Sequence, residues 1–72
     1  MALVNESEIR NRFQYHAPKG DQQERYVTAR DMGYGLAEYF THHSLPSREL
    51  SLALTKLEEA IMWFNAGIAR NE

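Results

Sequence analysis

The most constraining feature of this sequence is a segment close to its end that would be apolar on every side of a helix. Large apolar residues recur at alternating spacings of four and three, the period of one helix face: Leu50, Leu54, Leu57, Ile61, Phe64 and Ile68. We expect this helix to continue to Arg70, and within it residues 60–69 contain a single polar side chain, Asn65. One partner helix cannot cover a helix that has no polar face. We therefore predict that residues 60–69 form a subunit interface.

Small residues in the same helix also indicate an interface. Ala53, Ala60 and Gly67 lie seven residues apart, so they form a seam where the backbone of another helix can approach closely. Gly33 and Gly35 also need an explanation, because a glycine inside a helix lowers the stability of the helix by about 1 kcal/mol relative to alanine. The two glycines indicate either close approach of a partner or ligand, or a poorly optimised surface turn.

The first quarter of the chain carries a helix-start signal and then a break. Asn5 followed three residues later by Glu8 is typical of a helix N-cap with its capping-box partner, which predicts a helix over residues 6–13. Residues 16–20 contain Pro18 and end in a glycine, so regular structure stops there. This stretch is predicted to be a loop.

A second start signal precedes the longer middle helix. Asp21 with Glu24 repeats the capping pattern, and apolar residues at helical spacing follow, which predicts a helix over residues 22–42. Residues 41–47 form the expected turn, and Pro46 suits the first turn of the last helix.

The expected fold is a single all-α domain over residues 1–72, with a short N-terminal helix followed by a two-helix antiparallel hairpin, assembled as an oligomer. A chain of 72 residues has too little core to be stable by packing alone. Disulfides are excluded because the sequence contains no cysteine. Oligomerisation is the remaining source of stability.

Charge and hydropathy narrow the range of partners. The net charge of −2 argues against a polynucleotide partner, which requires a basic surface. Residues 9–30 are nevertheless locally basic, so a small anion is compatible with the sequence. No stretch approaches the roughly 20 apolar residues of a membrane span, and the start has no signal-peptide pattern. We expect a cytoplasmic protein without a membrane partner.

Nothing in the sequence indicates catalysis. The serines have no nucleophile-elbow context, there is no glycine-rich phosphate loop, and His16, His42 and His43 lack the spacing of zinc ligands. We expect no catalytic residue, no metal site and no cofactor.

Aromatic rings alternate with cations between residues 12 and 30. Bases stack on aromatic side chains, and phosphates accept charge-assisted hydrogen bonds from arginine or lysine, so the pattern fits a nucleotide-sized anion. The candidates in this segment are Arg12, Phe13, Tyr15, His16, Lys19, Gln22 and Arg30. Other interpretations remain open: Phe13 as a core residue, Tyr15 as a loop anchor, and Arg30 as a surface partner of an acidic neighbour.

Two motifs resemble a known family. Arg-Phe-x-Tyr-His-x-Pro-x-Gly-x-Gln over residues 12–22, and the run from Leu45 that closes on Met-Trp-x-Asn-Ala-x-Ile-Ala-Arg at residues 62–70, resemble the small helical-hairpin domain of phage anti-CBASS and anti-Thoeris sponge proteins. The resemblance covers nearly the whole chain.

The resemblance implies a homohexamer, built as a trimer of dimers, that sequesters immune signals in the cytoplasm of an infected bacterial host. The implied ligands are cyclic dinucleotides, cyclic trinucleotides, or the cyclic ADP-ribose isomers of Thoeris signalling. It places Tyr15 and Arg30 at a cyclic dinucleotide between protomers, and Arg70 at a cyclic trinucleotide. Asn65, in the closing motif, completes the set of expected ligand-binding residues. The alternative is a structural or regulatory helical oligomer that binds another protein and no ligand.

Overall fold

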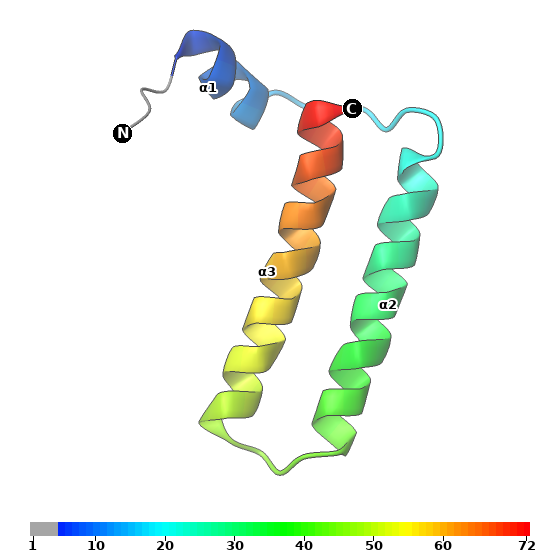
Figure 1. Ribbon diagram of the computed structural model, residues 1–72, viewed down its shortest axis with the longest axis vertical. Coiled ribbons are helices and arrows are strands. Elements are labelled where there is room, and N and C mark those ends of the chain that lie inside the picture. The colour runs from blue at the N-terminus through cyan, green and yellow to red at the C-terminus, as the bar shows by residue number, and fades with distance from the viewer. Residues whose placement is uncertain (1–4) are drawn as a thin grey trace.

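The computed structural model describes residues 5–72, and within that range the chain is entirely helical apart from loops (Figure 1). The helices are α1 (Glu6–Phe13), α2 (Gln22–His42) and α3 (Arg48–Asn71). The all-α prediction and the order of a short helix followed by a longer pair are confirmed, with the bounds 6–13 and 22–42 unchanged. The last helix ends one residue beyond the expected Arg70. Oligomeric assembly stays a prediction.

Side-chain caps begin the first and last helices. The Asn5 side chain accepts a hydrogen bond from the amide of Glu8 at 2.8 Å, as the capping pattern predicts. Ser47 caps α3 in the same way, because its hydroxyl accepts from the amide of Leu50 at 2.9 Å. The prediction that Pro46 lies in the first turn of α3 is wrong, since Ser47 is the N-cap and Pro46 precedes it. The ring of Pro46 fixes its φ angle, and this restricts the backbone just before the N-cap.

The start of α2 departs from the predicted capping box. The Asp21 side chain makes no capping hydrogen bond, because its carboxylate turns to Arg25, with Oδ1 lying 3.2 Å from Nε. The buried Gln22 closes the loop instead: its Oε1 accepts from the amide of Lys19 at 3.0 Å. Gly20 makes this turn possible because its φ of 55° favours glycine.

The two long helices lie antiparallel and side by side (Figure 1). Their closest approach is at Gly33, where an added Cβ would lie 3.1 Å from Ile61 Cγ1. Gly35 has open space instead, with nothing within 4 Å of such a Cβ. The two glycines therefore differ: Gly33 lets α3 come close, and Gly35 lies on the exposed side of α2.

The hairpin is a single layer and has almost no interior. The structure measures 46 × 34 × 15 Å, and its shortest dimension is little more than the roughly 10 Å of one helix with its side chains. Ile68, which is 5% exposed, is the one buried apolar residue within residues 5–72. Met62, Trp63 and Phe64, on successive sides of α3, are 62%, 62% and 50% exposed. Helix α2 therefore leaves most of the apolar surface of α3 uncovered.

The small-residue seam of Ala53, Ala60 and Gly67 is also outside the hairpin contact. Ala53 and Ala60 are exposed, and an added Cβ at Gly67 meets nothing within 4 Å. Helix α2 does not occupy the seam. Docking of another chain there stays a prediction.

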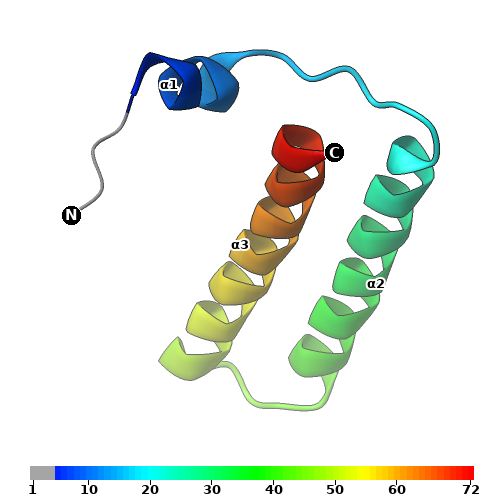
Figure 2. The ribbon, with the colours of Figure 1, turned by 45° about the horizontal axis from the view of Figure 1, so that its top comes forward.

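Helix α1 stands off the hairpin beside the end of α3 (Figure 2). One hydrogen bond joins them, from the Asn11 amide group to the carbonyl of Arg70 at 3.4 Å. Phe13 at the end of α1 is 86% exposed, so the interpretation of Phe13 as a core residue is wrong for the single chain. None of the helices in the described range has the length and apolar character needed to cross a membrane.

Candidate functional site

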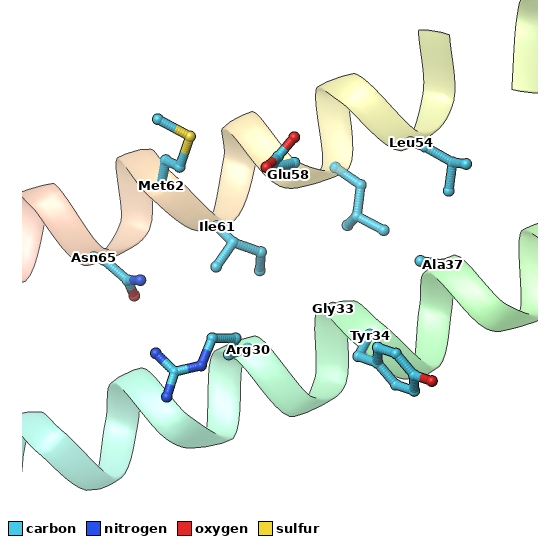
Figure 3. Close-up of a pocket in the computed structure, with 10 residues that line it drawn as sticks. Arg30, Gly33, Tyr34, Ala37, Leu54, Glu58, Ile61, Met62 and Asn65 are labelled. Atoms are coloured by element: carbon cyan, nitrogen blue, oxygen red, sulfur yellow. The ribbon is translucent and has the colours of Figure 1, made fainter. Parts of the chain in front are cut away.

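The candidate site is a groove along one face of the hairpin, between α2 and α3. Its larger part has a volume of about 530 Å³ and apolar walls that include Leu54, Leu57, Ile61 and Met62. Arg30 extends into it from α2 and Asn65 from α3, both at the same end (Figure 3).

A smaller hollow of about 300 Å³ continues the groove toward the open end of the hairpin. It shares Arg30 and Asn65 with the larger part, so the two side chains lie where the hollows meet. The remaining lining residues of this hollow are His16, Gln23, Tyr26, Ala66 and Ala69. We refer to the two hollows together as the α2–α3 groove.

The positive charge of Arg30 is available to bind an anion. Among the ion pairs within residues 5–72 none involves Arg30, so the interpretation that it pairs with an acidic neighbour is wrong for this structure. Glu38 binds His42 instead, at 2.7 Å. The Tyr34 hydroxyl and then His42 hold the pKa of Glu38 below its usual value, which keeps this carboxylate charged and engaged elsewhere.

Two polar atoms at the groove are buried without a hydrogen-bond partner among the described residues: the Tyr26 hydroxyl and Oδ1 of Asn65. Buried polar atoms are nearly always paired, so each unpaired one needs an explanation. Both belong to residues that line the smaller hollow. An unpaired cation and two unpaired polar atoms therefore converge on one part of the groove.

The structure brings only some of the predicted ligand residues together. His16, Arg30 and Asn65 line the smaller hollow of the groove. The ring of His16 is held by its Nε2, which lies 2.9 Å from the carbonyl oxygen of Asn11. Tyr15 is 81% exposed and lies outside the residues that line the groove.

The other residues of the N-terminal segment have different surroundings. Arg12 pairs with Glu8 along α1 at 2.7 Å. Lys19 is exposed, and its backbone amide is the one bound by Gln22. The buried Gln22 side chain therefore shapes the loop that carries Tyr15 and His16. Direct contacts from Arg12, Phe13, Lys19 and Gln22 to a ligand stay predictions.

Arg70 belongs to a separate hollow of about 490 Å³ between α1 and the end of α3. Its guanidinium lies 6.0 Å from the centre of the Trp63 ring, a distance typical of a cation–π contact. Arg10 lines the same hollow, so two cations meet there. Arg70 and Arg30 thus mark two different sites on one chain.

Tyr26 and Gln23 were missing from the predicted site. Tyr26 continues the apolar stripe of α2, so its position predicts a core residue. Its place in the stretch where aromatic residues alternate with cations was the available signal for a polar role. Gln23 carries no comparable signal.

Comparison with known proteins identifies the family. The family model described as the hairpin domain of Acb2/Tad1 matches residues 5–69, which include α1, α2 and nearly all of α3. The chain belongs to the Acb2/Tad1 hairpin family. The resemblance to anti-CBASS and anti-Thoeris sponges is thereby confirmed. No curated protein and no solved structure matches the chain.

The Acb2/Tad1 hairpin family is associated with sponge-like sequestration of cyclic nucleotide signals. Residues 5–69 contain the whole α2–α3 groove, so the groove belongs to the part of the chain that the family model describes. Arg70 lies just beyond the matched residues.

Proposed function

We propose that this protein binds and sequesters cyclic oligonucleotide second messengers, and so blocks CBASS-type antiviral signalling in the cytoplasm of a phage-infected bacterium. The observation that carries the proposal is the α2–α3 groove of an Acb2/Tad1 hairpin, where Arg30 has no ion pair and lies beside the unpaired atoms of Tyr26 and Asn65. Sequestration requires binding alone, and the proposal includes no catalytic step and no cofactor.

Arg30 is suited to a phosphodiester of the ligand. A guanidinium presents its N–H groups as a planar fork that matches two phosphate oxygens. No carboxylate of residues 5–72 forms an ion pair with Arg30, and Glu58 is the acidic residue that lines the same hollow. The apolar walls of the larger hollow, including Ile61 and Met62, provide surface for the nonpolar faces of bases or sugars. The same side chain is thus available to a charged ligand and adjacent to an apolar wall.

The site is incomplete in one chain. The groove lies open on one face of a layer only 15 Å thick, and Tyr15, the expected stacking residue, lies outside it. A second copy that covers the groove could supply Tyr15 and enclose the ligand, since enclosure by most of the surface is typical of small-molecule sites.

The exposed surface supports assembly. The chain has 6068 Å² of accessible surface, whereas a compact monomer of this mass has about 4,600 Å². Part of the excess comes from α1 and part from the uncovered sides of α3. We propose a homohexamer built as a trimer of dimers, with Met62, Trp63 and Phe64 buried between chains.

A thermal-shift screen tests the function. Cyclic dinucleotides, cyclic trinucleotides and cyclic ADP-ribose isomers are compared with linear dinucleotides as controls. A ligand at 100 times its dissociation constant stabilises the protein by about 2.7 kcal/mol, which corresponds to a rise in melting temperature of roughly 10–20 °C for a small domain. A shift with cyclic ADP-ribose isomers alone would make Thoeris signals the target. An unchanged melting temperature with every ligand contradicts the proposal and favours a structural or regulatory oligomer.

Variants locate the binding residues. We expect Arg30→Ala to weaken cyclic dinucleotide binding about tenfold to a hundredfold, since a charged hydrogen bond contributes about 1.5–3 kcal/mol. Tyr15→Ala should weaken binding through loss of stacking while the oligomer remains intact. Arg48→Ala is the matched control, because Arg48 is exposed at the start of α3 and lines none of the hollows described above. Wild-type affinity in both site variants by calorimetry would show that the site lies elsewhere.

A further inference from the structure

The polar atoms buried without partners in the smaller hollow indicate what it recognises. Oδ1 of Asn65 has no hydrogen-bond partner within residues 5–72 and is withdrawn from solvent. The Tyr26 hydroxyl is likewise buried and without a hydrogen-bond partner among the described residues. Leaving such groups unpaired is unfavourable for the free protein, so a ligand that draws the two side chains toward the hollow and pairs them gains binding energy that a purely apolar hollow does not offer.

The positions of these residues fit a flat group held next to a phosphate. Tyr26 lies one helical turn before Arg30 on α2, and Asn65 faces them from α3. Ala66 and Ala69 line the hollow on the α3 side, and their short side chains leave space beside the Asn65 amide. An aromatic base can enter where larger side chains would block it.

The chemistry of an asparagine amide selects among the bases. Its oxygen accepts and its nitrogen donates side by side, which matches adenine, where the N6 amino group donates and N7 accepts. Guanine presents two acceptors, O6 and N7, at the corresponding edge. Guanine at this edge would leave the Asn65 oxygen facing another acceptor.

We infer that Asn65 reads the N6/N7 edge of adenine in the α2–α3 groove, that the Tyr26 hydroxyl adds a second polar contact, and that this subsite determines which cyclic nucleotide the protein sequesters. The inference rests on the proposed function. Arg30, at the same place, binds phosphate, and phosphate contacts contribute affinity without sequence information, whereas base-edge contacts specify. Affinity and selectivity are therefore carried by neighbouring but different residues.

Calorimetric titration of cyclic di-AMP against cyclic di-IMP, in which a keto oxygen replaces each N6 amino group, tests the inference. Wild-type protein should bind cyclic di-AMP at least tenfold more tightly. Asn65→Leu should remove this preference, while Tyr26→Phe should weaken both ligands by roughly threefold to tenfold and keep it. Asn71→Leu is the control, because Asn71 is an exposed amide on the same helix that lines neither hollow, and this variant should retain the preference.

Measurements on the free variant separate recognition from structure. Because the Asn65 oxygen has no partner, ligand-free Asn65→Leu should melt at or above the wild-type temperature and keep the wild-type mass. A lower melting temperature or a changed mass would make Asn65 a folding or interface residue and overturn the inference.

Sequestration and adenine reading by Asn65 are contradicted by different results. If wild-type protein binds neither ligand and no other cyclic nucleotide of the thermal-shift screen, the proposed function fails. If it binds another cyclic nucleotide but neither of these two, adenine reading by Asn65 alone is overturned. Equal affinity of wild-type protein for the two ligands leaves sequestration intact but overturns adenine reading by Asn65. Retention of the preference by Asn65→Leu, or its loss in Asn71→Leu, has the same consequence.

Discussion

Replacing Gly67 with leucine distinguishes a free helix surface from an interface, because the two cases predict opposite signs. In the single chain an added Cβ at Gly67 meets nothing within 4 Å, so a side chain can start there without a close contact. The substitution also removes a glycine from a helix interior, which favours the helix by about 0.8–1.0 kcal/mol. An isolated hairpin would therefore become more stable.

The opposite result is expected if another helix lies on the seam of Ala53, Ala60 and Gly67. A branched side chain forced into a close helix contact costs about 1–3 kcal/mol, or more where neither backbone can move. After the helix gain of about 1 kcal/mol is subtracted, the net effect ranges from near zero to a loss of about 2 kcal/mol at each contact. Repeated at every interface of a symmetric oligomer, such a loss dissociates the assembly.

Light scattering and thermal melting of Gly67→Leu measure the two effects separately. We expect a smaller mass and a lower melting temperature. Gly35→Leu is the matched control, because an added Cβ at Gly35 also meets nothing within 4 Å. The control should keep its mass and melt roughly 4–8 °C higher, the shift expected for about 1 kcal/mol in a domain of this size. If Gly67→Leu behaves like the control, the seam is not an interface and the reasoning is refuted.

Three further predictions follow from contacts in the hairpin. Gly33→Val should destabilise the fold by about 1–3 kcal/mol in denaturant titrations, because even a Cβ there lies 3.1 and 3.2 Å from atoms of Ile61; an unchanged midpoint would contradict the close approach. Ser47→Ala should cost about 1 kcal/mol through loss of the α3 cap, measured by thermal melting, and a neutral result would mean that the cap is replaced by solvent. Arg25 holds the pKa of Glu72 below its usual value, so this pair stabilises the fold at neutral pH, and the stabilisation is lost as the pH falls through the depressed pKa. Glu72→Gln should flatten the fall of melting temperature in acid, and parallel wild-type and variant curves would show that the pair contributes nothing.

Much of the fold was predictable because its determinants are local. The Asn5 cap and the apolar period of α3 depend on residues within a turn or two of each other, and both predictions are confirmed. The capping box at Asp21 failed because a carboxylate has several possible partners, and Arg25, on the next turn, binds it instead. Only the three-dimensional structure shows that Gln22 holds the loop.

The site was less predictable because it depends on which positions of α2 and α3 face each other. Arg30 and Asn65 were each expected to bind a ligand, but their meeting at one place follows from the antiparallel register of the hairpin. The sequence places Tyr26 both on the apolar face of α2 and in the stretch where aromatic residues alternate with cations, and a helical stripe does not reveal whether a hydroxyl finds a partner. Tyr15 is exposed in the single chain, and its expected contact with a ligand depends on the proposed assembly, which the packing of one chain does not determine.

The central claim is that two chains enclose one cyclic nucleotide in a groove that a single chain leaves open. Calorimetric titration of the wild-type protein with cyclic di-AMP, with the mass of the same sample measured by light scattering, tests this claim most directly. We predict saturable binding at about one ligand per two chains, by an oligomer whose mass is a multiple of a dimer. Absence of binding heat, or binding of one ligand per chain by a monomer, would contradict the account.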